Sequence, residues 1–230
     1  MTQTFDSYKD NYRDVVQSSI DFSGLEHDFF MRAKARVLFE AIAARPHLGA
    51  PETLDYLDVG CGVGSFHPLV VGRFAQVSGC DVSGESVEKA TAANAEVVYR
   101  AYDGKRLPYD DGRFDVLTTI CVVHHVPPAE WTAFFAELRR VLKPGGIACV
   151  IEHNPFNPLT RLAVARCPFD EDAVLLAPRR ARGLFAGAGF SAVTTRQFLF
   201  LPWENGPALA AERALAWLPF GAQYLAVAEA

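Results

Sequence analysis

Between residues 53 and 152 the sequence alternates short apolar or β-branched runs with stretches of helical periodicity. Such alternation is typical of a mostly parallel sheet that is covered by helices on both faces. The expected strands are Thr53–Val59, Ala75–Asp81, Ala95–Ala101, Phe114–Cys121 and Gly146–Glu152, and the expected helices are Ser65–Arg73, Ser83–Asn94 and Pro128–Leu142. The pattern therefore predicts an α/β fold with a Rossmann-like, doubly wound sheet.

The segments that flank this core have different patterns. Before it, apolar residues at helical spacing predict two amphipathic helices that are broken near Asp21–Gly24. After it, a helix is expected at Pro178–Ala188, and the two expected strands Phe190–Leu201 and Gln223–Ala228 are predicted to pair antiparallel.

The length of the chain limits the number of domains. With 230 residues, half of them hydrophobic, the chain has material for one well-packed core but little for a second. We therefore expect one domain, in which 1–46 form a helical lid, 53–152 form a ligand-binding core and 153–230 supply substrate-side segments and the last strands.

Composition excludes several classes of function. The formal net charge of -5 gives no basic footprint for DNA or RNA. No apolar run reaches the ~18 residues that a membrane span needs. The 5 cysteines are odd in number and lie mostly in apolar runs, which is typical of buried thiols in a reducing compartment. We expect a cytoplasmic protein, monomeric or homodimeric, that acts on a small molecule and contacts neither nucleic acid nor membrane.

A glycine-rich turn follows the first expected strand and is expected to open a helix. Gly60, Gly62 and Gly64 let the backbone turn sharply and approach a closely held ligand. A dinucleotide fingerprint requires Gly-x-Gly-x-x-Gly, and here Ser65 stands where its third glycine belongs. The early glycine and the preceding Asp58 instead suit a ligand that ends in an amino-acid group.

Acidic residues follow the next two expected strands. Asp81 lies 21 positions after Gly60, where a carboxylate accepts hydrogen bonds from ribose hydroxyls. Tyr102, Asp103 and Gly104 follow the third strand, which places a second acid where an adenine amino group is read.

Five motifs in this order resemble those of class I S-adenosylmethionine-dependent methyltransferases. They are Leu57–Phe66, Gly79–Ser83, Tyr102–Asp103, Leu107–Asp115 and Leu138–Gly146. The resemblance covers roughly Thr53–Glu152 and implies a seven-stranded sheet with an antiparallel last strand, in agreement with the pattern of the tail. It also implies S-adenosylmethionine as the cofactor.

The resemblance assigns cofactor contacts position by position. The expected cofactor-binding residues are Asp58, Gly60, Cys61, Gly62, Asp81, Val82, Tyr102, Asp103, Gly104 and Cys121, joined from the lid by Tyr8 and Tyr12. Taken singly, these residues also have a structural reading, since the glycines make a tight turn, Asp81 caps a helix and Asp103 starts a turn. From their helix position, Arg32 and Lys34 are further candidates for the cofactor carboxylate.

Two adjacent histidines follow the fourth expected strand. Histidine suits proton abstraction near neutral pH, so His124 or His125 is the expected base, with Glu152 orienting it. This pairing looks like that of some sugar O-methyltransferases of the superfamily. One of the two rings is expected to point away from the cleft, where it caps a helix or packs in the core.

A metal is not expected to be required. Quinone-pathway O-methyltransferases have a Glu-x-x-Glu-His stretch here that is associated with a divalent cation. This sequence has Cys121 and His124 in place of the two acids, which disfavours a hard cation with oxygen ligands.

The expected substrate side begins after the fifth strand. His153, Asn154, Asn157 and Arg161 are candidates for binding the acceptor, although Asn157 equally suits the cap of a helix that begins at Pro158. Core packing is favoured for most aromatic residues of the lid and tail, such as Phe29, Phe30, Trp203 and Trp217.

These observations predict a methyltransferase for a small molecule, with a sugar or phenolic hydroxyl as the favoured acceptor. An N- or C-methyltransferase, a cofactor-binding scaffold without activity and, less favoured, an NAD-dependent oxidoreductase are the alternatives.

Overall fold

The computed structural model describes residues 12–230. Its strands are β1 (Asp55–Val59), β2 (Gln76–Asp81), β3 (Val98–Ala101), β4 (Phe114–Ile120), β5 (Leu142–His153), β6 (Ser191–Phe198) and β7 (Gln223–Glu229). Its α-helices are α2 (Tyr12–Ile20), α3 (His27–Ala43), α4 (Gly84–Ala93), α5 (Trp131–Val141), α6 (Pro158–Arg166), α7 (Pro178–Gly187) and α8 (Gly206–Leu215).

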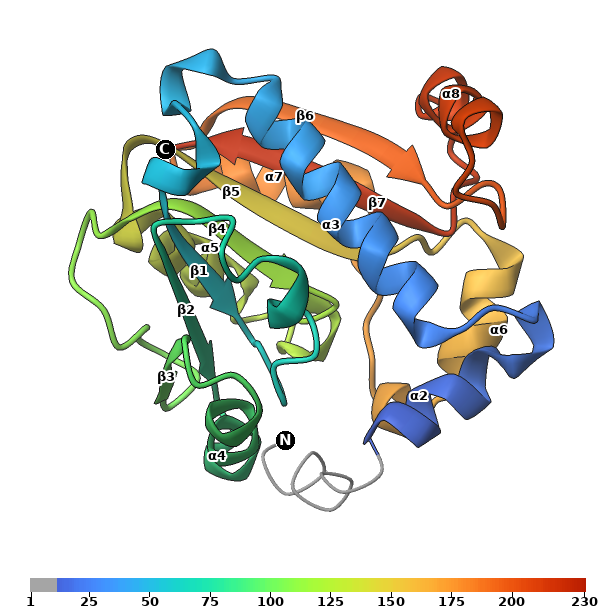
Figure 1. Ribbon diagram of the computed structural model, residues 1–230, viewed down its shortest axis with the longest axis horizontal. Coiled ribbons are helices and arrows are strands. Elements are labelled where there is room, and N and C mark those ends of the chain that lie inside the picture. The colour runs from blue at the N-terminus through green and yellow to red at the C-terminus, as the bar shows by residue number, and fades with distance from the viewer. Residues whose placement is uncertain (1–11) are drawn as a thin grey trace.

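The strands form one seven-stranded sheet in the order β3-β2-β1-β4-β5-β7-β6 (Figure 1). Strands β1 to β5 pair in parallel, whereas β7 runs antiparallel to both β5 and β6. The predicted α/β class and the reversed last strand are therefore confirmed.

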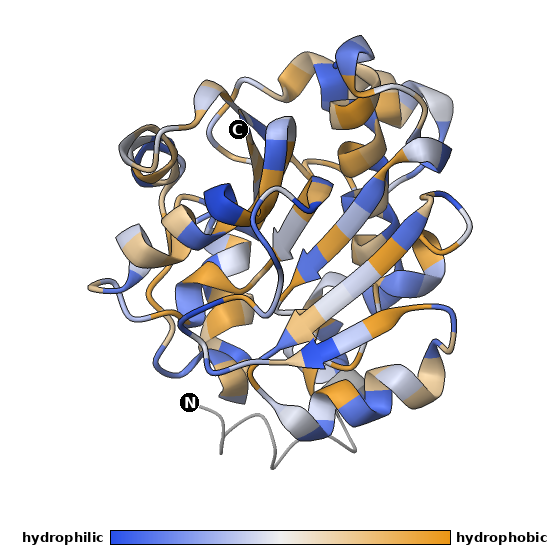
Figure 2. Cartoon of the chain, turned by 90° about the vertical axis from the view of Figure 1, so that its left-hand side faces the viewer, coloured by the Kyte–Doolittle hydropathy of each residue, from blue (hydrophilic) through white to orange (hydrophobic). Residues whose placement is uncertain are grey.

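Helices cover both faces of the sheet. Helix α3 packs on one face, where Val37 and Leu38 join the core around Tyr56. Helices α5 and α7 pack on the other face through Phe135 and Phe185. Hydrophobic residues recur along the strands, with polar residues between them (Figure 2), and β4 is buried along most of its length, as expected of a strand covered on both sides. Within residues 12–230, no helix combines the length and apolar character needed to cross a membrane.

The helix expected at Ser65–Arg73 is wrong. Only a single turn of 3-10 helix forms there, at His67–Leu69. Gly64 and Gly72, with φ of 75° and 74°, set left-handed backbone at both ends of the segment. Between them the buried His67 ring is held by the Tyr99 hydroxyl, so tertiary contacts fix the turn in place of a regular helix.

Candidate functional site

The site lies where the strand order reverses. Strands β1 and β4 are neighbours in the sheet, but their following segments lead to opposite sides, which is where ligands bind in open α/β sheets. The turn after β1 touches the segment after β4. A Cβ on Gly60 would lie 2.4 Å from Val122 Cγ2, so only glycine fits at this position. The Gly60 and Cys61 N–H groups both donate to the Cys80 carbonyl, and the Cys61 thiol is buried.

Asp81 and Gly62 are joined directly. The Gly62 N–H donates to Asp81 Oδ2 at 2.8 Å, and the Ser83 N–H donates to Asp81 Oδ1 at 2.9 Å. Each carboxylate oxygen keeps a lone pair for a further donor. Gly62 has φ of +52°, and a Cβ built on it would meet nothing within 4 Å. The turn therefore forms an open cradle beside an oriented carboxylate, which fits an amino-acid end and a ribose.

This cradle gives a direct test. Gly62→Ala places a methyl group in the open space where the cofactor is expected. We therefore expect the affinity for S-adenosylmethionine to fall at least about 10-fold, which corresponds to a loss of ~1.4 kcal/mol in binding free energy. Calorimetric titration measures it. Gly72→Ala is the matched control, since Gly72 also has positive φ and open space but lies in an exposed turn. Both changes cost about 1–2 kcal/mol of stability; equal affinities in the two variants would refute the cradle.

Asp58 is buried beneath the turn. Its Oδ1 accepts the Thr118 hydroxyl at 2.8 Å, and its Oδ2 lies 3.4 Å from His67 Nε2. Its carboxylate thereby ties β1 to β4 and to the segment after the glycines.

The residues expected to face adenine lie in different environments in the structure. Val82 and Gly104 face each other, since a Cβ on Gly104 would lie 3.4 Å from Val82 Cγ1. Tyr102 is half-buried and packs against the core. Asp103 is exposed, and its Oδ1 accepts the Lys105 and Arg106 N–H groups at 2.9 and 3.1 Å, so it starts a turn, as its structural reading predicts. Tyr8 lies outside the described residues, and Tyr12 begins α2.

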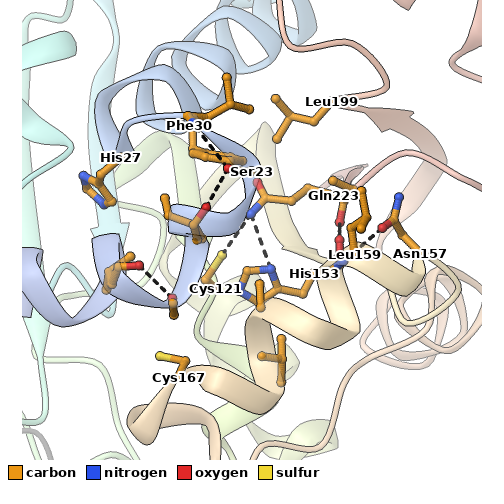
Figure 3. Close-up of a pocket in the computed structure, with 18 of the residues that line it drawn as sticks. Ser23, His27, Phe30, Cys121, His153, Asn157, Leu159, Cys167, Leu199 and Gln223 are labelled. Carbon is orange, nitrogen blue, oxygen red and sulfur yellow. Dashed lines mark hydrogen bonds between the residues drawn. The ribbon is translucent and has the colours of Figure 1, made fainter.

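The segment that follows β4 borders a cavity of about 700 Å³, which Cys121, His124 and His125 help to line (Figure 3). Helices α2 and α6, which lie side by side in Figure 1, form part of its wall, together with α3 and the loop after β6. Most lining side chains are apolar, among them Phe29, Phe30, Leu159, Leu199 and Leu201. The expectation of core packing is confirmed for Phe29, which is buried in the core, and for Phe30, which packs against it, although both also line the cavity. The expectation is wrong for Trp203 and Trp217, which are 59% and 79% exposed.

Glu212 of α8 holds the loop that closes one side of the cavity. Its carboxylate accepts the N–H groups of Leu199, Phe200 and Leu201 at 2.9, 2.6 and 2.7 Å. Glu212→Ala is expected to lower the free energy of unfolding by about 2 kcal/mol, because buried N–H groups lose their acceptor. Urea denaturation measures it, with the exposed Glu96→Ala as the control, expected within about 0.5 kcal/mol of the unchanged protein. A similar small loss at Glu212 would contradict the role of its carboxylate.

His124 is held between two carboxylates. Its Nδ1 lies 2.5 Å from Glu152 Oε2, and its Nε2 lies 3.3 Å from Asp170 Oδ1. Glu152 is itself fixed by the N–H groups of Val122 and Val123, at 3.0 and 2.7 Å. Burial alone lowers the pKa of His124, but the two carboxylates outweigh it and hold that pKa well above its ordinary value. Glu152 therefore holds the His124 ring in place, and the raised pKa favours the protonated form of His124.

His125 also faces the cavity. Both rings line it, so the expectation that one must point away is wrong: the 3-10 turn Val123–His125 brings their centroids to 4.1 Å. His125 Nε2 lies 3.4 Å from Asp170 Oδ1. Burial, and next the charge of His124, lower the pKa of His125 to about 4. His125 is therefore neutral near pH 7.

Cys121 and His153 form a second polar group on the cavity wall. The Cys121 backbone has φ of 56°, which turns the chain sharply at the end of β4. Burial raises the pKa of the Cys121 thiol, but Lys34 and His153 outweigh burial and lower that pKa from its ordinary value to about 7. Lys34 lines the cavity, whereas Arg32 turns outward to pair with Glu204 at 2.6 Å.

The structure separates the residues expected to bind the acceptor. Asn154 is fully buried, and its amide donates to the carbonyls of Pro219 and Gly221 at 2.8 and 2.7 Å. Its side chain is thus committed to holding the loop before β7. Arg161 is exposed and does not line the cavity. Asn157 lines the cavity but also caps α6, since its Oδ1 accepts the Thr160 N–H at 2.9 Å.

Asp170 was missed by the sequence reasoning. It lies in the 3-10 turn Pro168–Asp170 after α6, far along the chain from His124. A hydrogen bond of 2.9 Å from the Val174 N–H to the His124 carbonyl helps to bring the two segments together. The only sequence signal for Asp170 is that an acid follows a Pro-Phe pair, and this pattern is typical of many ordinary turns.

Comparisons with known proteins find methyltransferases. Residues 57–150 match the methyltransferase domain family. The 2-methyl-6-phytyl-1,4-hydroquinone methyltransferase of Synechocystis is 30% identical over 150 residues, which cover 62% of this chain and 41% of that protein. The norajmaline N-methyltransferase of Rauvolfia serpentina is 32% identical over 134 residues, 54% of this chain and 45% of that protein. The chain thus spans less than half the length of these relatives.

A solved structure matches along the whole chain. It is a SAM-dependent methyltransferase from Thermotoga maritima, described as a possible histamine N-methyltransferase, with a TM-score of 0.68 and 17% identity. The match covers 100% of this chain and 99% of that one, and it shows the same fold.

Proposed function

We propose that the chain is a class I S-adenosylmethionine-dependent methyltransferase, since residues 57–150 match the methyltransferase domain family, and that it methylates a phenolic hydroxyl of a small, largely apolar acceptor. The observation that carries the proposal is the apolar cavity at the end of β4, into which the neutral His125 and its partner Asp170 face. When bound, the cofactor supplies an electrophilic methyl group on its sulfonium.

The residues of this chain fit that cofactor. Gly60 and Gly62 would present backbone to its methionine end, and Asp81 would accept hydrogen bonds from its ribose hydroxyls. Val82 and Gly104 would flank its adenine, and Cys121 would border its methyl group. The support is the open space over Gly62 and the anchored Asp81 carboxylate.

The cavity favours a phenol over a sugar. Its lining is mostly apolar, so a polyhydroxylated sugar loses hydrogen bonds to water without replacing them. An aromatic ring matches Phe29 and Phe30 and keeps one polar oxygen for the histidines.

His125 is the proposed proton acceptor. His124 carries a proton already, with its Nδ1 at Glu152 and its Nε2 at Asp170, whereas His125 is neutral. As His125 takes the proton, the Asp170 carboxylate at 3.4 Å stabilises the imidazolium that forms. A histidine whose pKa is about 4 is a weak base, which suits the more acidic phenol over an aliphatic hydroxyl.

An amine acceptor is the second candidate. The Rauvolfia serpentina relative is named as an N-methyltransferase, and an amine needs less help from a base. For this candidate, the neutral His125 receives the proton that the amine releases after methylation.

Two measurements test the proposal in order. Calorimetry with S-adenosylmethionine and, separately, NAD is expected to give micromolar binding of the former alone. A mass-spectrometric screen of phenols, amines and sugars then follows transfer of a methyl group labelled with deuterium. Product from phenols alone supports the proposal, product from amines alone favours the second candidate, and binding without any product leaves a cofactor-binding scaffold.

A further inference from the structure

We propose that His124, His125 and Asp170 form a binding site for a divalent transition-metal ion, of which Zn²⁺ fits the donor set best. The inference goes beyond the proposed methyl transfer and does not depend on the acceptor. It uses the position of Asp170, which the sequence pattern does not reveal.

The ligand atoms lie near the spacing of a metal site. Asp170 Oδ1 lies 3.3 Å from His124 Nε2 and 3.4 Å from His125 Nε2. Bonds of roughly 2.0–2.1 Å that meet at a tetrahedral angle place ligand atoms about 3.3 Å apart. Both contacts of Asp170 match this spacing. One ligand atom from each of the three residues lies within 4.8 Å of the others, so rotation of the side chains is enough to bring the two imidazoles to a shared ion.

The surroundings of His124 also match a metal ligand. A metal-bound histidine usually donates its other ring N–H to a carboxylate, which fixes the ring and increases its donor strength. His124 Nδ1 makes this contact with Glu152 Oε2 at 2.5 Å, and Glu152 is itself held by two backbone N–H groups.

The donor set selects the class of ion. Two imidazoles and one carboxylate suit Zn²⁺ and related transition metals, whereas Mg²⁺ and Ca²⁺ prefer oxygen ligands. This agrees with the sequence-based argument against a hard cation. All three residues line the cavity, so an ion has a path of entry and keeps an open position toward the cavity.

Metal and proton compete for the same nitrogen atoms. An ion bound to His125 Nε2 uses the imidazole that the proposed function assigns to proton transfer. Bound Zn²⁺ is therefore expected to slow turnover, and a chelator is expected to restore it. This consequence rests on the proposed function. Unchanged turnover in the zinc-bound protein would remove His125 as the base but would leave the metal site in place.

Metal binding itself is tested without cofactor or acceptor. Protein stripped with a chelator is titrated with Zn²⁺ by calorimetry and with Co²⁺ by visible absorption, which reports the coordination geometry. We expect one ion per chain, Co²⁺ bands typical of tetrahedral or five-coordinate sites, and a rise in Tm on zinc loading.

Variants locate the ion. Asp170→Asn and His125→Gln are expected to weaken Zn²⁺ binding at least about 100-fold, and Glu152→Gln about 10–100-fold. Asp172→Asn, an exposed acid two residues from Asp170, is the matched control and is expected to bind normally. If Asp170→Asn does not fold, His125→Gln provides the same test. Absence of stoichiometric binding, or binding that none of the three changes weakens, would overturn the proposal.

Discussion

Replacing Glu152 by alanine is expected to lower the free energy of unfolding by about 3–5 kcal/mol, because it leaves a protonated His124 in the core without its closest partner. Glu152 is 0% exposed, so water cannot replace its carboxylate. The N–H groups of Val122 and Val123 lose their acceptor in the same step. Urea denaturation, with the unfolding followed by circular dichroism, measures the loss.

Glu152→Gln separates charge from shape. The amide keeps an oxygen for the two backbone N–H groups but no longer balances the charge on His124, so we expect a smaller loss, about 1–3 kcal/mol. Glu130→Gln, outside the core, controls for removal of a carboxylate and is expected within about 0.5 kcal/mol of the unchanged protein. A loss below about 1 kcal/mol for Glu152→Ala would show that His124 is not charged in the folded protein.

Much of the fold follows from local patterns. The strands β1, β2 and β4 and helix α4 lie within one to three residues of their predicted bounds, because apolar runs and helical spacing are properties of neighbouring residues. The segment 65–73 shows the limit of such reasoning. Its conformation depends on the contact between His67 and Tyr99, which are distant in the sequence, and periodicity carries no information about that contact.

The site was predictable where its residues follow strands. Gly62 lies in the turn after β1, Asp81 ends the neighbouring strand β2, and the structure joins them by a hydrogen bond. The pairing of Glu152 with His124 follows in the same way, from the neighbouring strands β4 and β5. Asp170 comes from a turn after a helix, where no strand end fixes its position. The sequence therefore predicts one carboxylate beside the histidines but not the second.

The spacing of residues in the sequence does not predict the direction in which their side chains point. Asn154 follows β5 directly, as a substrate residue would, yet its amide is used by the carbonyls of the loop before β7. Adjacent histidines on a strand would point to opposite sides, but the 3-10 turn at Val123–His125 brings both to one side. Such turns are short, and the sequence gives no strong signal for them.

His125→Gln is expected to lower turnover of a phenolic acceptor by about 10²–10⁴-fold, the usual contribution of a general base. Glutamine keeps a polar group beside Asp170 but cannot take a proton at neutral pH. The affinity for S-adenosylmethionine is expected to stay within about 2-fold, since His125 lines the acceptor cavity and not the glycine turn. Single-turnover kinetics, with a chelator present to keep the site free of metal, measure the chemical step.

A series of phenols of different acidity distinguishes proton transfer from a structural role. A more acidic phenol needs less help from a base, so the loss caused by His125→Gln is expected to shrink as the acceptor pKa falls. A packing defect would instead slow every acceptor by the same factor. His47→Gln, at an exposed histidine, is the matched control and is expected to leave turnover unchanged. An equal loss across the whole series would show that His125 has only a structural role in the cavity wall, and His153 would then be the next candidate for the base.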